Sequence, residues 1–139
     1  MPIISLSKNN YIVILTLLCL NFCSAQITSD INKIKEDYQN CLDHADLMVG
    51  CSYDYYNKAD SLLNVVYYKI RIKLNPTQKN TFKKEQMQWL KKRDSYFKKV
   101  RRTETNSNEG FLGNDLKMII ADKQAEFVFE RIEELLKRL

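Results

Sequence analysis

Apolar side chains recur at every third or fourth position through four stretches of the chain, at residues 27–45, 55–70, 82–100 and 116–139. This repeat matches the turn of an α-helix and gives each stretch one apolar face. No stretch alternates apolar and polar residues in the manner of a strand. The pattern predicts an all-α fold, a small antiparallel bundle of one short and three long helices.

Helix-breaking residues are scarce after residue 25, and each predicts a boundary between helices: Gly50, Pro76, Gly110 and Gly113. Before the third helix, Asn75 can act as the cap, Pro76 suits the first helical position, and Gln78 completes a capping box. The polar residues 103–110 predict a loop, and the last helix is predicted to begin near Asn114. Connections this short make consecutive helices antiparallel.

The first residues have the three parts of a secretory signal peptide in order. Lys8 supplies positive charge, residues 11–22 are apolar, and Ala25 provides a small side chain at the cleavage point. We therefore predict a signal peptide at residues 1–25, cleavage before Gln26, and export to the periplasm or the extracellular space.

Two other fates of this N-terminal segment are less favoured. Acylation at Cys23 makes a lipoprotein, but the bulky Phe22 stands where that processing requires a small side chain. The apolar run of twelve residues is also shorter than the roughly 20 that a membrane-spanning helix needs. The mature chain is predicted to be one domain, residues 26–139, without an integral membrane segment.

The cysteine count predicts one disulfide. Cys19 and Cys23 leave with the signal peptide, so Cys41 and Cys51 are the pair that remains in an oxidising compartment. Closing this short loop stabilises the fold by about 2.5–3 kcal/mol in the chain-entropy model. Two buried free thiols are the alternative, which is unusual in exported chains.

Polar residues interrupt the apolar face of the third helix. Gln86 and Arg93 share that face with Trp89, and buried polar groups need partners. Folding this helix back on the preceding one brings Asp60 level with Arg93 and Asn64 level with Gln86. We predict a structural polar ladder between the two helices, with a partly buried Asp60–Arg93 ion pair. A catalytic role is the alternative, but no nucleophile or general base accompanies the pair.

These residues resemble the LprI-like lysozyme inhibitor domain family, formerly a domain of unknown function found in many exported bacterial proteins. The resemblance covers nearly all of the mature chain and rests on the order and spacing of Cys41, Cys51, Tyr56, Ala59, Asp60, Leu63, Asn64, Tyr67, Gln86, Trp89, Leu90, Arg93, Asp94, Arg131, Glu134 and Leu135. It implies a non-enzymatic protein that inhibits lysozyme by binding, so the implied partner is a lysozyme-type muramidase. Family members typically carry a second cysteine pair, and Phe97 stands where the first of those cysteines lies; we expect its ring to fill the core instead.

Charge divides the chain into a basic and an acidic part. Residues 76–102 hold ten basic side chains and two acidic ones, whereas residues 30–60 hold seven acidic and three basic ones. The net charge is +5, or +4 once Lys8 leaves with the signal peptide. Because host lysozymes are mostly strongly basic with an acidic cleft, the acidic end is the more plausible inhibitory surface.

The turn bracketed by the two cysteines supplies the candidate contacts for such a partner. Its candidate partner-binding residues are Asp43, Asp46, Leu47, Met48 and Val49. A disulfide that holds this turn preorganises it for binding a cleft. The alternative is that the apolar turn residues only cover one end of the core.

The basic third helix suggests a second function, attachment to an anionic envelope polymer or lipid surface. Its candidate contacts are Lys83, Lys84, Lys91, Lys92, Lys98, Lys99, Arg101 and Arg102. A solvated helix face is the alternative. Export argues against a nucleic-acid partner.

The sequence carries no recognisable catalytic or metal-binding motif. His44 is the only histidine, so Asp43 and Asp46 beside it lack the second nitrogen ligand of a typical metal site. No glycine-rich phosphate loop is present, and no serine or cysteine is arranged with a histidine for nucleophilic attack. We therefore predict neither a metal site nor a cofactor.

Overall fold

The computed structural model describes residues 8–107 and 113–139 of the chain. Its elements are four helices joined by turns: α1 (Lys8–His44), α2 (Met48–Arg71), α3 (Pro76–Ser107) and α4 (Asn114–Leu136). No strand occurs in these residues. The all-α prediction is confirmed, and the part of α1 that follows residue 25 is the shortest of the four helical segments.

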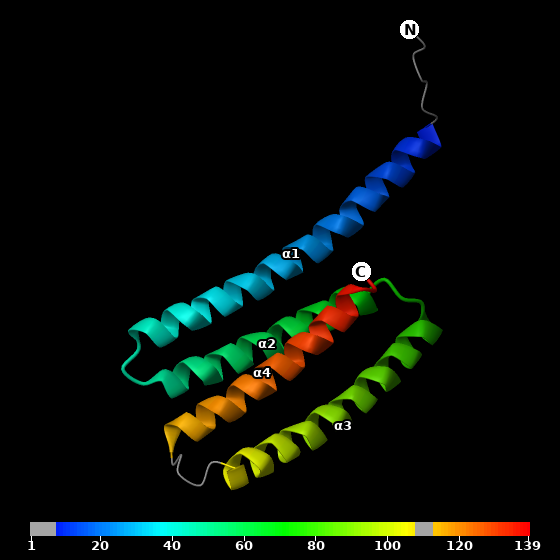
Figure 1. Cartoon of the computed structure of the whole chain (residues 1–139). Helices are drawn as coiled ribbons and strands as arrows, with labels where there is room; N and C mark the ends of the chain where they lie inside the picture. Colours follow the sequence, from blue (N-terminus) through cyan, green and yellow to red (C-terminus); the bar gives the residue numbers. More distant parts are fainter. Residues whose placement is uncertain (1–7, 108–112) are drawn as a thin grey trace.

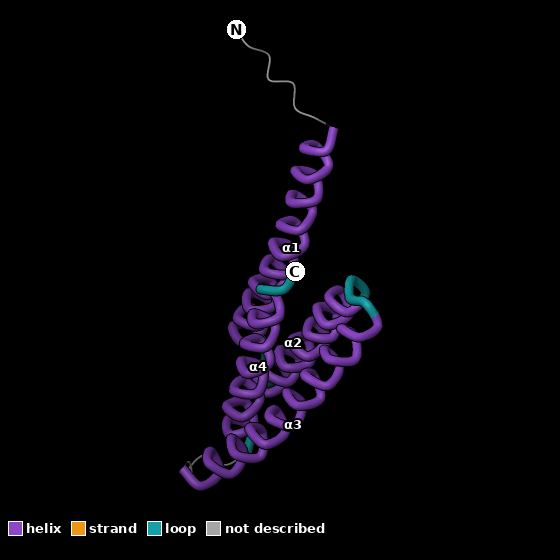
Figure 2. The backbone as a smooth tube through the Cα atoms, turned by 90° about the vertical axis from the view of Figure 1, so that its right-hand side faces the viewer, coloured by secondary structure: helices purple, strands orange, loops and turns teal. Residues whose placement is uncertain are grey.

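The centre of the bundle consists of α2 and α4. These two helices lie side by side and run in the same direction, while α1 packs along α2 and α3 packs along α4 (Figure 1, Figure 2). Each helix is antiparallel to the next one in the chain, as the short connections require. The first turns of α1 extend beyond the other three helices (Figure 1). No described helix combines the length and the hydrophobicity that crossing a bilayer requires.

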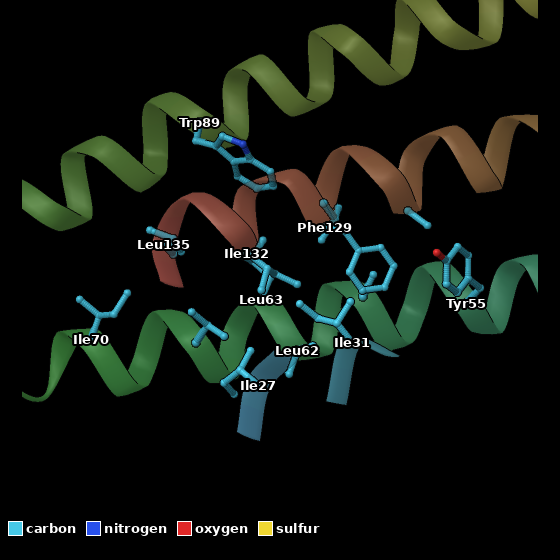
Figure 3. Packing of buried hydrophobic residues seen from close by; sticks show 14 of the residues in the cluster. Ile27, Ile31, Tyr55, Leu62, Leu63, Ile70, Trp89, Phe129, Ile132 and Leu135 are labelled. Carbon is cyan, nitrogen blue, oxygen red and sulfur yellow. The ribbon is translucent and has the colours of Figure 1, made fainter. Parts of the chain in front are cut away.

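The core forms where the apolar faces of the four helices meet. Ile27 from α1 and Leu63 from α2 pack against the buried stripe of α4, which contains Phe129 and Ile132. Figure 3 shows these side chains between the helices, with Trp89 reaching in from α3. The three- and four-residue spacing read from the sequence selects the buried face of α2. In α4 it selects a neighbouring face: Leu116, Ile120 and Phe127 of the predicted stripe are only partly buried, whereas Ala121, Ala125, Val128 and Ile132 are buried.

The boundaries of α3 agree with the sequence prediction at one end and differ at the other. The backbone N–H of Gln78 donates to Asn75 Oδ1 at 2.9 Å, and the backbone N–H of Asn75 donates to Gln78 Oε1 at 3.0 Å, which is the predicted capping box. The predicted loop at 103–110 is wrong over its first part, because α3 continues to Ser107. An ion pair from Glu104 to Lys123 of α4 holds these polar turns against the bundle.

The connections around α2 and α4 also follow the breaker residues. Gly50 lies in the first turn of α2, two residues from its start. Gly113 precedes α4, which begins at Asn114 as predicted, and its φ of 94° lies in the left-handed region that glycine adopts without strain. Gly110, the remaining predicted boundary, lies outside the described residues.

The disulfide joins the end of α1 to the beginning of α2. The sulfur atoms of Cys41 and Cys51 are 2.06 Å apart and the Cα atoms 5.8 Å apart, with a sequence separation of 10. This confirms the predicted pairing. Phe97 also packs as expected, since its ring meets the ring of Tyr56 edge-on at 5.8 Å and lies against the core.

Replacing both bridging cysteines with serine is expected to lower the free energy of unfolding by about 2.5–3 kcal/mol, because the unfolded chain regains the entropy of the open loop. Urea denaturation followed by circular dichroism measures the change. Reductant should destabilise the unaltered protein by a similar amount and should have no effect on the Cys41→Ser/Cys51→Ser variant. A variant as stable as the unaltered protein contradicts this role of the disulfide.

Candidate functional site

The ion pair between α2 and α3 is present at the predicted place. Asp60 Oδ1 lies 3.5 Å from Arg93 Nη1, and the two side chains are 36% and 23% exposed. Arg93 also donates to the neighbouring Asp94 carboxylate from Nη2 at 2.9 Å and from Nε at 3.1 Å. The guanidinium therefore divides its bonds between the two helices, and the contact with Asp60 is the longer one.

The other step of the predicted ladder is arranged differently. The side-chain amide of Asn64 donates to the backbone oxygen of Asp60 at 3.0 Å, within α2. Gln86 Oε1 accepts a hydrogen bond from Arg131 Nη2 at 3.2 Å, so Gln86 connects α3 to α4 and not to α2. The interpretation of Asn64 and Gln86 as partners is corrected, because a buried cationic donor on α4 outcompetes the amide of the exposed Asn64.

Arg131 is the most deeply buried charged residue among those described, with 5% of its surface exposed. Its Nη1 donates to Glu134 and its Nη2 to Glu85, both at 2.9 Å. The guanidinium lies over the Trp89 ring, 5.8 Å from the centroid. The Nε atom is buried without a hydrogen-bond partner. Two carboxylates and an aromatic face thus compensate the cost of burying this cation.

Sequence reasoning did not select Arg131 as a site residue. The signal was present, because a charged residue stands within the apolar stripe of the last helix at the position between Phe127 and Leu135. Long side chains at such positions are often assumed to extend to solvent. Here the guanidinium stays inside and becomes the main polar connection between α3 and α4.

Two arginines lie near the Trp89 ring. Arg93 lies 5.9 Å and Arg131 5.8 Å from its ring centroid, and the Phe127 ring stacks at 5.9 Å. Only 8% of Trp89 is exposed. The indole is therefore a structural element of the α3–α4 contact.

A cleft of about 360 Å³ opens beside this network. Its lining residues come from α3 and α4: Glu85, Gln88, Trp89, Lys92, Phe127, Glu130, Arg131 and Glu134. The cleft contains acids and cations but no hydroxyl, thiol or imidazole that could act as a nucleophile with a base. Among the described residues, no three His, Cys, Asp or Glu side chains gather where they could hold a metal ion.

A second polar cluster, which the sequence did not reveal, lies near the disulfide. The Tyr38 hydroxyl donates to Asp122 Oδ1 at 2.7 Å and shares a hydrogen bond with the fully buried Ser52 Oγ at 2.8 Å. The Tyr38 and Tyr55 rings stack at 4.3 Å, and the Tyr55 hydroxyl donates to Glu126. Burial and the neighbouring carboxylate raise the pKa of Tyr38 to about 12. The cluster ties α1, α2 and α4 together at neutral pH.

We call residues 41–54 the hairpin tip, because they comprise the end of α1, the turn and the start of α2. Leu47 is 69% exposed and Met48 46% exposed. These two side chains do not cover the core. Met48 and Val49 belong to the first turn of α2 and not to a loop, and no side chain caps the start of that helix.

The polar residues of the hairpin tip surround this exposed apolar pair. Asp43 and Asp46 are both exposed. Asp43 accepts a hydrogen bond from Gln39 at 3.0 Å, and the His44 ring nitrogen Nδ1 meets the backbone oxygen of Asn40 at 2.8 Å. The sequence-predicted partner residues therefore lie together in the hairpin tip, and Val49 among them is half-buried.

The predicted anion-binding residues spread over the solvent-exposed side of α3, with Lys83 at the edge toward α2 and Lys92 at the edge toward α4. We call them the basic face, and all eight are exposed: Lys83, Lys84, Lys91, Lys92, Lys98, Lys99, Arg101 and Arg102. The carboxylates of the same helix are engaged elsewhere, Glu85 with Arg131 and Arg138 and Asp94 with Arg93. No ion pair to a described carboxylate neutralises the basic face.

A family model described as lysozyme inhibitor LprI matches residues 40–135, which is more than half of the chain. The matched segment begins next to Cys41 and ends after Glu134, so it contains the hairpin tip, the Asp60–Arg93 pair and the Arg131 network. Searches of the curated proteins and of the solved structures found no match.

Acid is expected to destabilise the fold through Glu85. Hydrogen bonds from Arg138 and Arg131 lower the pKa of Glu85 below its ordinary value. Its ionised form therefore contributes stability that is complete above the pKa of the unfolded chain, about 4.3, and is lost as the pH falls through the lower pKa of the folded state. Thermal unfolding should give Glu85→Gln a lower melting temperature than the unaltered protein at neutral pH, and this difference in melting temperature should shrink below about pH 4. A difference independent of pH contradicts this assignment.

The Arg131 network and the Asp60–Arg93 pair are expected to contribute unequally to the free energy of unfolding. Arg131→Ala should lower the free energy of unfolding by about 3 kcal/mol or more, because it leaves carboxylates and the Trp89 ring without their buried partner. Asp60→Ala should cost less than about 1 kcal/mol, because that pair is long and partly solvated. Urea denaturation measures both, and a larger loss for Asp60→Ala contradicts the ranking.

Proposed function

We propose that this chain, which belongs to the lysozyme inhibitor LprI family, inhibits a lysozyme-type muramidase by inserting the hairpin tip into its substrate cleft. The protein acts by binding and performs no chemistry. It works outside the cytoplasm, in the periplasm or the extracellular space, after residues 1–25 have been removed.

The exposed pair Leu47 and Met48 is the observation that carries the proposal. Their side chains are 69% and 46% exposed, and they lie where α1 connects to α2, between the two cysteines of the Cys41–Cys51 disulfide. Apolar anchors on a rigid base bind at a low entropy cost, since the free protein already holds the bound conformation.

The base of the hairpin tip supports this rigidity from inside. Ser52, at the start of α2, is fully buried and bonded to the Tyr38 hydroxyl, which also donates to Asp122 of α4. The disulfide and these bonds fix α1, α2 and α4 relative to one another within a few residues of Leu47. Insertion into a cleft therefore costs the hairpin tip little reorganisation.

The charge of the hairpin tip suits a basic partner. Residues 41–54 contain no lysine or arginine. Asp54 is paired with Lys58 of α2 at 2.9 Å, whereas Asp43 and Asp46 form no ion pair with a described cation. These carboxylates attract the basic surface of a lysozyme and accelerate the encounter. Lysozymes cleave glycans with two carboxyl groups in the cleft. The uncapped start of α2 presents the positive end of a helix dipole beside Met48, which complements those carboxyl groups.

Inhibition is tested by titrating a basic lysozyme with the purified mature protein while cell-wall lysis is followed by turbidity. We expect inhibition by the unaltered protein, and a loss of at least about tenfold in potency for Leu47→Ala/Met48→Ala, because both anchors are truncated. The matched control is Val65→Ala/Ile72→Ala, which truncates two exposed apolar residues, one in α2 and one just after its end, far from the hairpin tip.

The control variant should inhibit like the unaltered protein, and circular dichroism should show that both variants fold. Absence of inhibition at micromolar excess contradicts the function itself. Inhibition that survives in Leu47→Ala/Met48→Ala contradicts the assigned surface. A parallel Asp43→Asn/Asp46→Asn variant should slow association and weaken its dependence on salt.

A further inference from the structure

We propose that the basic face of α3 is a docking surface for a linear anionic glycan of the cell exterior, a polymer with carboxylate or phosphate groups along its length. The surface is separate from the hairpin tip and goes beyond lysozyme inhibition. Its occupant is identified by charge, by the shape of the helix and by the polar groups between the cations.

The charge on this surface is uncompensated. Residues 76–102 carry ten basic and two acidic side chains. The two acids, Glu85 and Asp94, bond arginines outside the basic face. Eight cations therefore remain exposed without a described carboxylate partner. Like charges at this density repel each other in the free protein, and a polyanion relieves that repulsion.

The cations are ordered along the helix axis. Lys84, Lys91 and Lys98 are seven residues apart, which is close to two helical turns, so they fall on one side of α3 at intervals of about 10.5 Å. Arg102 continues the same row one turn later. The row is about 27 Å long, which matches an extended polymer better than a single small anion.

The remaining side chains of the surface favour a glycan over a lipid bilayer. Met87 is the large apolar residue exposed on α3, and one such side chain gives little insertion into a membrane. The surface around Lys84 and Lys91 is shallow and includes the amide groups of Asn80 and Gln88. Amides and ammonium groups together suit a chain that carries both hydroxyl and anionic groups.

The position of α3 leaves the hairpin tip free. α3 lies on the flank of the bundle opposite α1, and the turn between α1 and α2 is at an end of the bundle (Figure 1). A glycan along the outer side of α3 therefore does not cover Leu47 or Met48. The protein can be retained on an envelope polymer and still offer its hairpin tip to a soluble partner.

The test is binding of the mature protein to polygalacturonate, a linear carboxylate glycan, with dextran phosphate as the phosphate arm and dextran as the neutral arm. We expect binding to at least one anionic glycan and none to dextran. Lys84→Gln/Lys91→Gln/Lys98→Gln/Arg102→Gln should lose at least about tenfold in affinity. Its slope of log affinity against log salt should fall by about 3, since four charge contacts are removed.

The matched control removes the same charge elsewhere, through Lys33→Gln/Lys73→Gln/Lys117→Gln/Lys137→Gln, and should change the affinity by less than about twofold. An equal loss in both variants overturns the proposal, because net charge alone then explains the binding. Salt-insensitive binding overturns it too. So does tighter sedimentation with phosphatidylglycerol vesicles than with either anionic glycan, which assigns the surface to lipid. Lysozyme is absent from these assays, so their outcome is independent of the inhibition test.

Discussion

The burial of one cation, Arg131, sets the relation between the two C-terminal helices. A guanidinium inside a protein is tolerated only where carboxylates and other acceptors meet it in a fixed geometry. Glu85 and Gln86 on α3 and Glu134 on α4 supply that geometry, and Trp89 covers the guanidinium from the α3 side. α3 therefore cannot rotate about its axis without leaving the cation unpaired. The Arg131 network on the inner side of α3 thus keeps the basic face of that helix exposed to solvent.

This constraint matters because α3 buries little apolar surface of its own. Phe82, Trp89 and Val100 are its buried hydrophobic residues, whereas α2 and α4 each bury six or more. Hydrophobic burial alone gives such a helix a weakly defined orientation. The Arg131 network and the Asp60–Arg93 pair supply the specificity that a small apolar stripe lacks. With its orientation in the bundle fixed in this way, α3 can carry a strongly basic outer surface.

Local rules account for what the sequence predicted well. The four helices, the capping box at Asn75 and the Cys41–Cys51 bridge each depend on residues close together in the chain, or on a cysteine count with one solution. The partner of Gln86 was missed because α3 lies against both α2 and α4, and the periodicity of one helix does not say which neighbour each polar residue meets. The extension of α3 to Ser107 was missed for the same reason, since its Glu104 pairs with α4.

Stability and the proposed recognition of a partner therefore involve different residues of this protein. The Arg131 network and the Tyr38 cluster lie inside, where substitution changes the fold as a whole. Leu47 and Met48 are exposed and belong neither to the core cluster nor to the side chains packed against it. A disulfide that fixes an exposed apolar pair among aspartates is expected if that pair meets a partner. The proposed inhibition by binding needs this combination of a rigid interior and an accessible end.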